Sequence, residues 1–85
     1  MLVEELGLTE KLQEYRARQV WEQAVGPGLV QYARPLRVRQ GRMEVAVPSA
    51  VWRNQLTFMK QDIIGKINEL VGREVIKELI LVNQP

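Results

Sequence analysis

The sequence predicts an α+β domain of α-β-β-α-β order, in which a three-stranded mixed sheet packs on two helices. Three observations predict it: a long stripe of apolar residues at helical spacing over 49–72, two short alternating strands before it, and an apolar strand after it. With 85 residues, the chain is expected to form a single domain over 1–85 with one modest core. We expect residues 1–8 to be loosely ordered and residues 83–85 to form a frayed end.

The first helix is predicted over residues 10–25, with Thr9 as its N-cap. Its expected inner face is apolar at helical spacing and consists of Leu12, Val20, Trp21, Ala24 and Val25. Gly26-Pro27-Gly28 should end this helix, because proline cannot continue it and glycine tolerates positive φ. Residues 29–33 could form one more turn before Pro35 forces an extended backbone.

Two strands are predicted next, because apolar and charged residues alternate on either side of Gln40-Gly41. A two-residue loop of this kind suits a tight hairpin turn. One face of the hairpin is apolar, with Leu36, Val38, Met43, Val45 and Val47, and we expect it to pack against the long helix. The other face gathers four charged residues, Arg37, Arg39, Arg42 and Glu44.

The chain is organised around residues 49–72, which we predict to form one continuous helix. Ser49 is its candidate N-cap, and Gly72 follows the last periodic residue, where a left-handed cap would end the helix. The expected inner stripe consists of Trp52, Leu56, Met59, Ile63, Ile67 and Leu70. Val51 and Phe58 lie off this stripe on one flank. Packing against the first helix is the main interpretation of that flank, and contact with a partner is the alternative.

Residues 75–82 are predicted to form the third strand. The segment is apolar at both parities apart from Lys77 and Glu78, so we expect it to be covered on both faces. A strand–helix–strand connection within one sheet is right-handed and usually makes the two strands parallel. We therefore expect the second strand to be central and the third to lie at an edge, where it could pair with a second copy.

Basic residues are concentrated in the middle of the chain, between mildly acidic ends. Residues 34–60 contain Glu44 as their only acidic residue and six basic ones, which are Arg34, Arg37, Arg39, Arg42, Arg53 and Lys60. Such a block can contact phosphates or an acidic protein surface, and it can also be a solvated face without a partner. These six are the candidate nucleic-acid-binding residues. Because no aromatic residue lies on a predicted strand, binding should follow the nucleic-acid backbone and depend strongly on salt but little on sequence.

Catalysis is poorly supported by the sequence. The chain has no histidine and no cysteine, which removes the commonest general base, the commonest zinc ligand and every thiolate. Its carboxylates are scattered along predicted helices, and no G-x-x-x-x-G-K-[ST] loop exists. We therefore expect no enzymatic activity, no cofactor, no metal and no small-molecule substrate. The lack of cysteine agrees with a cytoplasmic location, and no apolar run approaches the ~18 residues of a membrane span.

Two motifs in a fixed order carry a resemblance to a known family. The first is W-x-x-x-V-G, formed by Trp21 with Val25-Gly26, and the second is S-x-x-W-x-x-x-L, formed by Ser49, Trp52 and Leu56. Between and after them come Pro35, Gly41 ahead of M-x-V-x-V, and Leu70-Val71-Gly72. This order resembles the DciA family of bacterial replicative-helicase loaders or operators, and the similarity covers residues 6–82.

The resemblance implies a KH-like domain that engages the replicative DNA helicase and can bind DNA, without hydrolysing ATP. It makes Trp21, Gly26, Trp52 and Leu56 the structural signature and assigns no catalytic residue. The G-x-x-G loop of RNA-binding KH domains is missing, since Gly65 stands alone in its helix. Many family members also carry an extended basic tail, whereas this sequence stops at Pro85, so we expect DNA binding to be weak. We expect the bound DNA to be single-stranded. Two alternatives stay open: a general nucleic-acid-binding KH-like module, and a structural or self-associating module that binds no nucleic acid.

Overall fold

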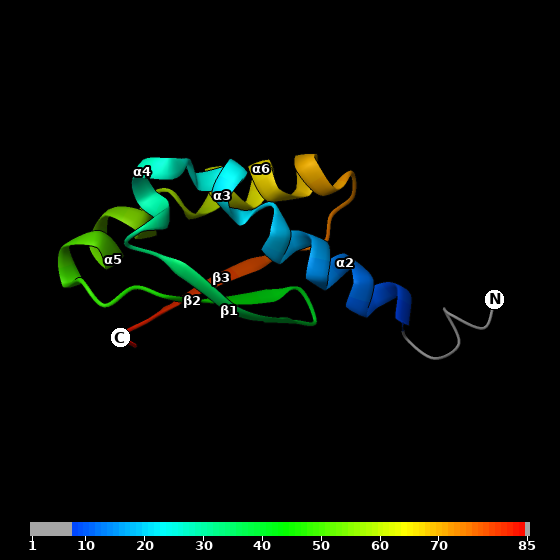
Figure 1. Ribbon diagram of the computed structural model, residues 1–85, viewed down its shortest axis with the longest axis horizontal. Helices are drawn as coiled ribbons and strands as arrows, with labels where there is room; N and C mark the ends of the chain where they lie inside the picture. Colours follow the sequence, from blue (N-terminus) through cyan, green and yellow to red (C-terminus); the bar gives the residue numbers. More distant parts are fainter. Residues whose placement is uncertain (1–7, 85) are drawn as a thin grey trace.

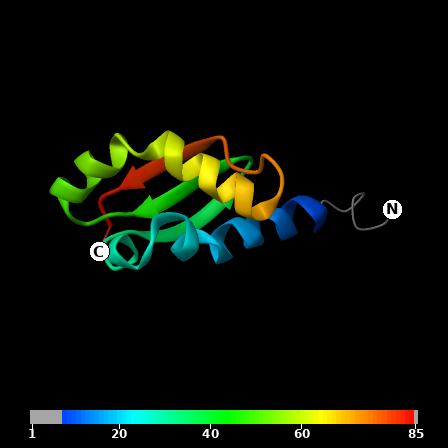
Figure 2. The ribbon, with the colours of Figure 1, turned by 90° about the horizontal axis from the view of Figure 1, so that it is seen from above.

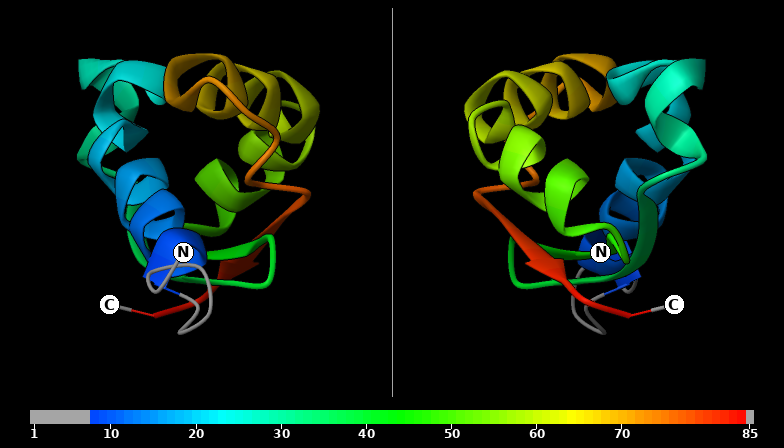
Figure 3. Two further views of the ribbon diagram at one scale, coloured as in Figure 1. Left: turned by 90° about the vertical axis from the view of Figure 1, so that its right-hand side faces the viewer. Right: turned by 90° about the vertical axis from the view of Figure 1, so that its left-hand side faces the viewer.

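A three-stranded sheet forms one layer of the structure and helices form the other (Figure 1). The computed structural model describes residues 8–84, so the predicted loose segment lies, except for Leu8, outside the described residues. The strands are β1 (Arg34–Arg39), β2 (Arg42–Ala46) and β3 (Glu78–Val82). The helices of the described chain all lie on the same face of the sheet, as the end-on views show (Figure 3). The predicted α+β class with a three-stranded mixed sheet is confirmed.

The central strand is β2, which pairs antiparallel with β1 and parallel with β3, as predicted. The hairpin turn is Gln40-Gly41, with φ of 52° and 81°, the double positive φ that a two-residue hairpin turn requires. The Gly41 carbonyl also accepts hydrogen bonds from the N–H groups of Lys77 and Glu78, at 2.7 and 3.1 Å. The same turn therefore sets the point at which β3 begins.

The first strand departs from strict alternation at Leu36. Pro35 pairs with Val45 and Arg37 pairs with Glu44, which leaves Leu36 as the extra residue of a bulge. Leu36 is only partly buried as a result. The predicted alternation holds for the rest of the hairpin, where Val38, Met43, Val45 and Val47 are buried.

Within the described residues, two helices replace the single predicted helix over 10–25: α2 (Leu8–Gln19) and α3 (Trp21–Val25). A third short helix, α4 (Pro27–Val30), follows them before the sheet. Because α2 begins at Leu8, Thr9 lies inside the helix, and its predicted role as N-cap is wrong. The chain bends at Val20, whose ψ of 1° is not helical. It bends again at Gly26, whose φ of 87° is a conformation that glycine adopts easily because it has no Cβ. Pro27 then starts α4 at the first helical position, where its missing N–H costs nothing.

The buried side of α2 and α3 is centred on Ala17 and Trp21. Trp21 is only 2% exposed, and its Nε1 donates a hydrogen bond to the carbonyl of Ala33 at 3.0 Å. Leu12 was predicted on the inner face but is 51% exposed, so that prediction is wrong. Five residues separate it from Ala17, which places it about 140° around the helix, on the outer side. The other predicted residues, Val20, Ala24 and Val25, are partly buried against the core.

The predicted single helix over 49–72 is in fact two helices, α5 (Ala50–Thr57) and α6 (Lys60–Val71). Phe58 and Met59 separate them, and their N–H groups donate to the carbonyls three residues earlier, at 3.2 and 2.9 Å. Such bonds tighten the last turn of a helix and end its α-helical ladder. No helix among residues 8–84 is both long and apolar enough to cross a membrane.

Both predicted ends of the 49–72 segment are confirmed. The Ser49 hydroxyl accepts a hydrogen bond from the Trp52 N–H at 3.3 Å, and Gly72 ends α6 in the left-handed conformation. The break changes what the helices bury, because a stripe calculated for one straight helix does not continue across it. Leu56, Ile63 and Ile67 are buried as predicted, with Ile64 in addition. Leu70 is 45% exposed, however, and its predicted place in the core is wrong.

Two further predictions fail in the same region. Phe58 and Val51 are 81% and 69% exposed, so they do not pack against the first helix. Trp52, which the predicted inner stripe places in the core, is only partly buried against it, and its ring stacks on Tyr32 with ring centroids 4.6 Å apart. In the view from above, α4 and α5 lie at the end of the molecule away from α2 (Figure 2).

The third strand is covered on one face only, which corrects the prediction of cover on both. Leu79 faces the helices and is buried, whereas Ile80 lies on the opposite face and is only partly buried. The start of this strand is tied to α6 by Asn68, whose Nδ2 donates to the Ile76 carbonyl at 2.9 Å. The Asn68 Oδ1 accepts from the N–H groups of Val75 and Ile76, at 2.9 and 2.8 Å. One polar side chain thus holds the loop that leads into β3.

Candidate nucleic-acid interface

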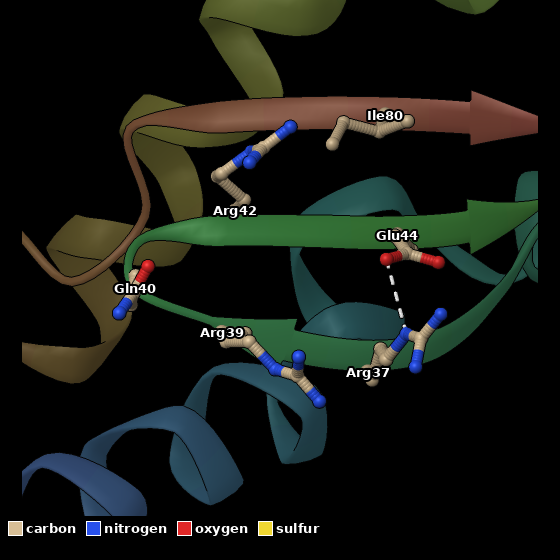
Figure 4. A pocket seen from close by; sticks show the side chains of 6 residues that line it. All are labelled: Arg37, Arg39, Gln40, Arg42, Glu44 and Ile80. Atoms are coloured by element: carbon tan, nitrogen blue, oxygen red, sulfur yellow. Dashed lines mark hydrogen bonds and ion pairs between the residues drawn. The ribbon is translucent and has the colours of Figure 1, made fainter.

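The outer face of the sheet, which no described helix covers, carries the charged residues of the hairpin (Figure 4). They border a shallow depression of about 170 Å³. Its lining comes from all three strands and the hairpin turn, and consists of Arg37, Arg39, Gln40, Arg42, Glu44 and Ile80. Below, we call this surface, together with Arg34, the outer arginine face.

Strand register explains why these side chains meet. Arg39 pairs with Arg42 across the hairpin, and Arg42 pairs in turn with Glu78 of β3. Two residues further along, Glu44 of β2 pairs with Arg37 on one side and with Ile80 on the other. Directly paired residues present their side chains on the same face of a sheet. One row therefore holds two arginines and a glutamate, and the next holds an arginine, a glutamate and an isoleucine.

Two of the arginines are engaged in exposed ion pairs. The Arg37 Nε lies 3.0 Å from the Glu44 Oε2, and the Arg42 Nε lies 3.4 Å from the Glu78 Oε1. Pairs between exposed side chains contribute only about 0–1 kcal/mol to stability, because water screens them and ordering both chains costs entropy. These guanidinium groups can therefore exchange a carboxylate for a phosphate at a small energetic cost.

The other two arginines of β1 complete this surface. Arg39 is exposed and makes no hydrogen bond or ion pair with any residue that the structure describes. Arg34 is exposed and pairs with Ala46, which lies two residues after Glu44 in β2. Alternate residues of a strand share a face, so the Arg34 side chain lies on the outer face with Glu44. The surface therefore carries Arg34, Arg37, Arg39 and Arg42 against Glu44 and Glu78.

The structure does not bring Arg53 and Lys60 to this face. Arg53 is partly buried, and its Nη1 donates hydrogen bonds to the carbonyls of Val47 and Pro48, at 2.7 and 3.1 Å. Its guanidinium connects α5 to the end of β2. Lys60 is the first residue of α6, in the helical layer behind the sheet. Of the six candidate residues, four share the outer face and two belong to the helical layer.

Residues from β3 belong to this surface, and sequence reasoning did not include them. Glu78 neutralises part of the charge of Arg42, and Ile80, paired with Glu44, is the apolar residue among those that line the depression. Glu78 and Ile80 are two residues apart, so the sequence could have indicated that they share a face of β3. Their position beside Arg42 and Glu44 also required the parallel register of β3 with β2. The tertiary pairing therefore lowers the net positive charge that the sequence indicated for this face.

No base-stacking platform exists on the outer arginine face. The five aromatic residues, Tyr15, Trp21, Tyr32, Trp52 and Phe58, all belong to the described chain, and none lies in a strand. Readers of single-stranded nucleic acid stack bases on aromatic side chains. The chemistry offered here is a set of guanidinium donors, which suits phosphate oxygens. Within residues 8–84, no group of three or more acidic side chains is placed to hold a metal ion.

Comparison with known proteins agrees with the order of motifs in the sequence. A family model described as "Dna[CI] antecedent, DciA" matches residues 1–81. The chain is also similar to a UPF0232 protein of Rhodococcus jostii, with 32% identity over 78 residues, covering 92% of this chain and 42% of the relative. A UPF0232 protein of Mycobacterium tuberculosis is 28% identical over 78 residues, with the same coverage. The chain thus spans less than half the length of these relatives.

Proposed function

The chain belongs to the DciA family, and from this premise we propose that it is a non-enzymatic adaptor in DNA replication. In this proposal it binds the replicative DNA helicase and assists the loading of that helicase on DNA, in the bacterial cytoplasm. The observation that supports it most directly is the family match over residues 1–81. Because the chain spans only 42% of its relatives, the proposal concerns the part of the loader that this domain supplies.

A binding test decides the main proposal. The purified chain is mixed with the cognate replicative helicase, and complex formation is measured with and without single-stranded DNA. We expect a stable complex and faster loading of the helicase on DNA than with helicase alone. Absence of both a complex and a stimulation of loading would overturn the proposal. ATP consumption by the chain alone serves as a control and should not rise above background.

We propose weak, sequence-independent binding of single-stranded DNA as an auxiliary activity of the same domain. The outer arginine face supports it, because four guanidinium groups lie together on a surface that the described helices leave open. Phosphate contacts of this kind position a nucleic acid without reading its bases, and their affinity falls steeply with salt. The same surface would serve a general nucleic-acid-binding module, which is the second candidate function.

Self-association is the third candidate, and it concerns the free edge of the sheet. The β1 edge contains Pro35 and the bulge at Leu36, two features that discourage further strand pairing. By contrast, among residues 8–84 β3 pairs only with β2, and it has the sequence ELILV, without proline or a bulge. Sedimentation at high protein concentration separates the possibilities. A monomer over the whole range would count against pairing of two β3 strands.

A further inference from the structure

One carboxylate lies in the middle of the outer arginine face. Glu44 belongs to the central strand β2 and pairs with Arg37 of β1 (Figure 4). Arg42 precedes it by two residues on the same strand, and Arg39 pairs with Arg42 across the hairpin. Arg34 lies in the row on the other side of Glu44. Because residues two apart on a strand are only about 7 Å apart, every arginine of this face is in the row of Glu44 or in a row beside it.

The charge of Glu44 is less exposed to water than that of the other glutamate of this face, Glu78. The Glu44 side chain is 30% exposed and the Glu78 side chain 58%. The Glu44 Oε2 lies 3.0 Å from the Arg37 Nε, compared with 3.4 Å between Glu78 and Arg42. Water and salt screen a partly covered charge less than an exposed one. Glu44 therefore lowers the positive potential of the outer arginine face more than Glu78 does.

The Glu44 carboxylate and a phosphate use the same donors. A guanidinium presents its N–H groups to carboxylate and phosphate oxygens in the same planar geometry. The Arg37 Nε donates to Glu44, so it can bind a phosphate only after the carboxylate has been displaced. Arg39, by contrast, is exposed and makes no hydrogen bond or ion pair with any described residue. A phosphate can therefore contact Arg39 at once, but it has to replace Glu44 to reach Arg37.

We propose that Glu44 is an internal competitor of phosphate and limits the DNA affinity of the outer arginine face. Its carboxylate occupies the place that a DNA phosphate takes on Arg37. This inference rests on the proposed binding of single-stranded DNA, since it names the residue that sets the strength of that binding. A face of this kind also releases DNA readily, because a carboxylate of the same surface replaces the departing phosphate at a small energetic cost.

The test is Glu44→Gln, which removes the charge and keeps the size of the side chain and one acceptor oxygen. We expect its affinity for a labelled oligothymidylate to rise about fivefold at low salt, the factor that corresponds to the upper value for an exposed ion pair. The plot of log affinity against log salt concentration should become steeper by about 0.7, the value for one additional phosphate contact on a single strand. A purely structural role of Glu44 would not make this plot steeper.

Two further variants serve as controls. Glu69→Gln changes the net charge by the same amount, and Glu69 is exposed on α6 in the helical layer, so its affinity and salt dependence should stay nearly unchanged. In a chain that already carries Arg37→Gln, the change Glu44→Gln should raise the affinity less, because the donor that it releases is gone. The thermal unfolding midpoint of each variant shows that the domain remains folded.

The outcomes distinguish this inference from the function on which it rests. If neither the unmodified chain nor Glu44→Gln binds the oligonucleotide, the proposed DNA binding fails. If the unmodified chain binds, and Glu44→Gln and Glu69→Gln change the affinity equally, Glu44 is not a competitor while the DNA binding stands. A lower affinity of Glu44→Gln also overturns the inference. So does a gain that is equally large in the Arg37→Gln chain, since the carboxylate would then not compete at Arg37.

Discussion

The Arg53 guanidinium donates a hydrogen bond to the carbonyl of Val47 at 2.7 Å and a second one to Pro48 at 3.1 Å. These contacts join the start of α5 to the end of β2 across the Pro48 turn. The sequence indicates Arg53 as a candidate for phosphate binding, but in the structure its guanidinium is hydrogen-bonded within the protein. Its main contribution is therefore expected to be to stability.

Replacement of Arg53 should lower stability without weakening DNA binding. Hydrogen bonds that involve a charged group contribute about 1.5–3 kcal/mol, so Arg53→Ala should reduce the free energy of unfolding by roughly that amount. Urea denaturation measures the free energy of unfolding, and a DNA titration at constant salt measures the affinity for DNA. Unchanged stability together with weaker DNA binding would show that Arg53 belongs to the nucleic-acid interface after all.

Charge reversal on the outer arginine face should weaken DNA binding. Arg39→Glu combined with Arg42→Glu removes two guanidinium groups that border the depression. We expect the plot of log affinity against log salt concentration to become shallower by about 1.4, the value for two lost phosphate contacts on a single strand. Affinity itself is measured by fluorescence anisotropy with a labelled oligonucleotide.

The matched control for this charge reversal is Lys11→Glu combined with Lys66→Glu. Both lysines are exposed, and they lie on α2 and α6 in the helical layer. This control changes the net charge of the chain by the same amount without touching the outer face. Equal loss of affinity in the two variants would mean that overall charge, rather than this surface, governs binding.

The two tryptophans should differ in their contribution to stability. Trp21 is fully buried and hydrogen-bonded to Ala33, so Trp21→Ala should cost about 3–5 kcal/mol and could unfold so small a domain. Trp52 is only partly buried, so Trp52→Ala should cost less, about 1–3 kcal/mol. Thermal and urea unfolding of both variants give the comparison. A larger loss for Trp52→Ala would contradict the burial described above.

Asn68 should be essential for the position of β3. Asn68→Ala leaves the N–H groups of Val75 and Ile76 without their acceptor and should cost roughly 2–4 kcal/mol. Asn68→Asp keeps the acceptor oxygen and loses only the donor to the Ile76 carbonyl, so it should cost less. Urea denaturation of the two variants tests this order. Equal stability of both variants would show that the acceptor bonds contribute little.

Short-range features of the fold could be predicted from the sequence. The turn at Gln40-Gly41, the cap at Ser49 and the helix end at Gly72 all depend on residues within a few positions of each other. The alternation of apolar residues in β2 is equally local, and it predicted the buried face of the hairpin. The sheet order followed from chain connectivity, since one helical connection joins two strands of the same sheet.

The candidate site could be predicted only in part. Arg37, Arg39 and Arg42 share a face because strands alternate, and this was visible in the sequence. Glu78 lies beside these arginines because of the register between β2 and β3, and a local sequence pattern does not predict that register. Arg53 does not belong to the outer arginine face, because its guanidinium donates to backbone carbonyls. A sequence pattern does not show which carbonyls are free to accept such bonds.

By itself, the sequence indicated the hairpin, the two ends of the 49–72 segment, the sheet order and the family of this chain. Only the tertiary structure decided that the 49–72 segment breaks at Phe58 and Met59, that Phe58 is uncovered, and that the helices leave one face of the sheet open. The physical reason is the range of the interactions. Caps and turns form between near neighbours, whereas burial depends on which distant side chains compete for the same apolar surface. The outer arginine face is one of the surfaces that this packing leaves exposed.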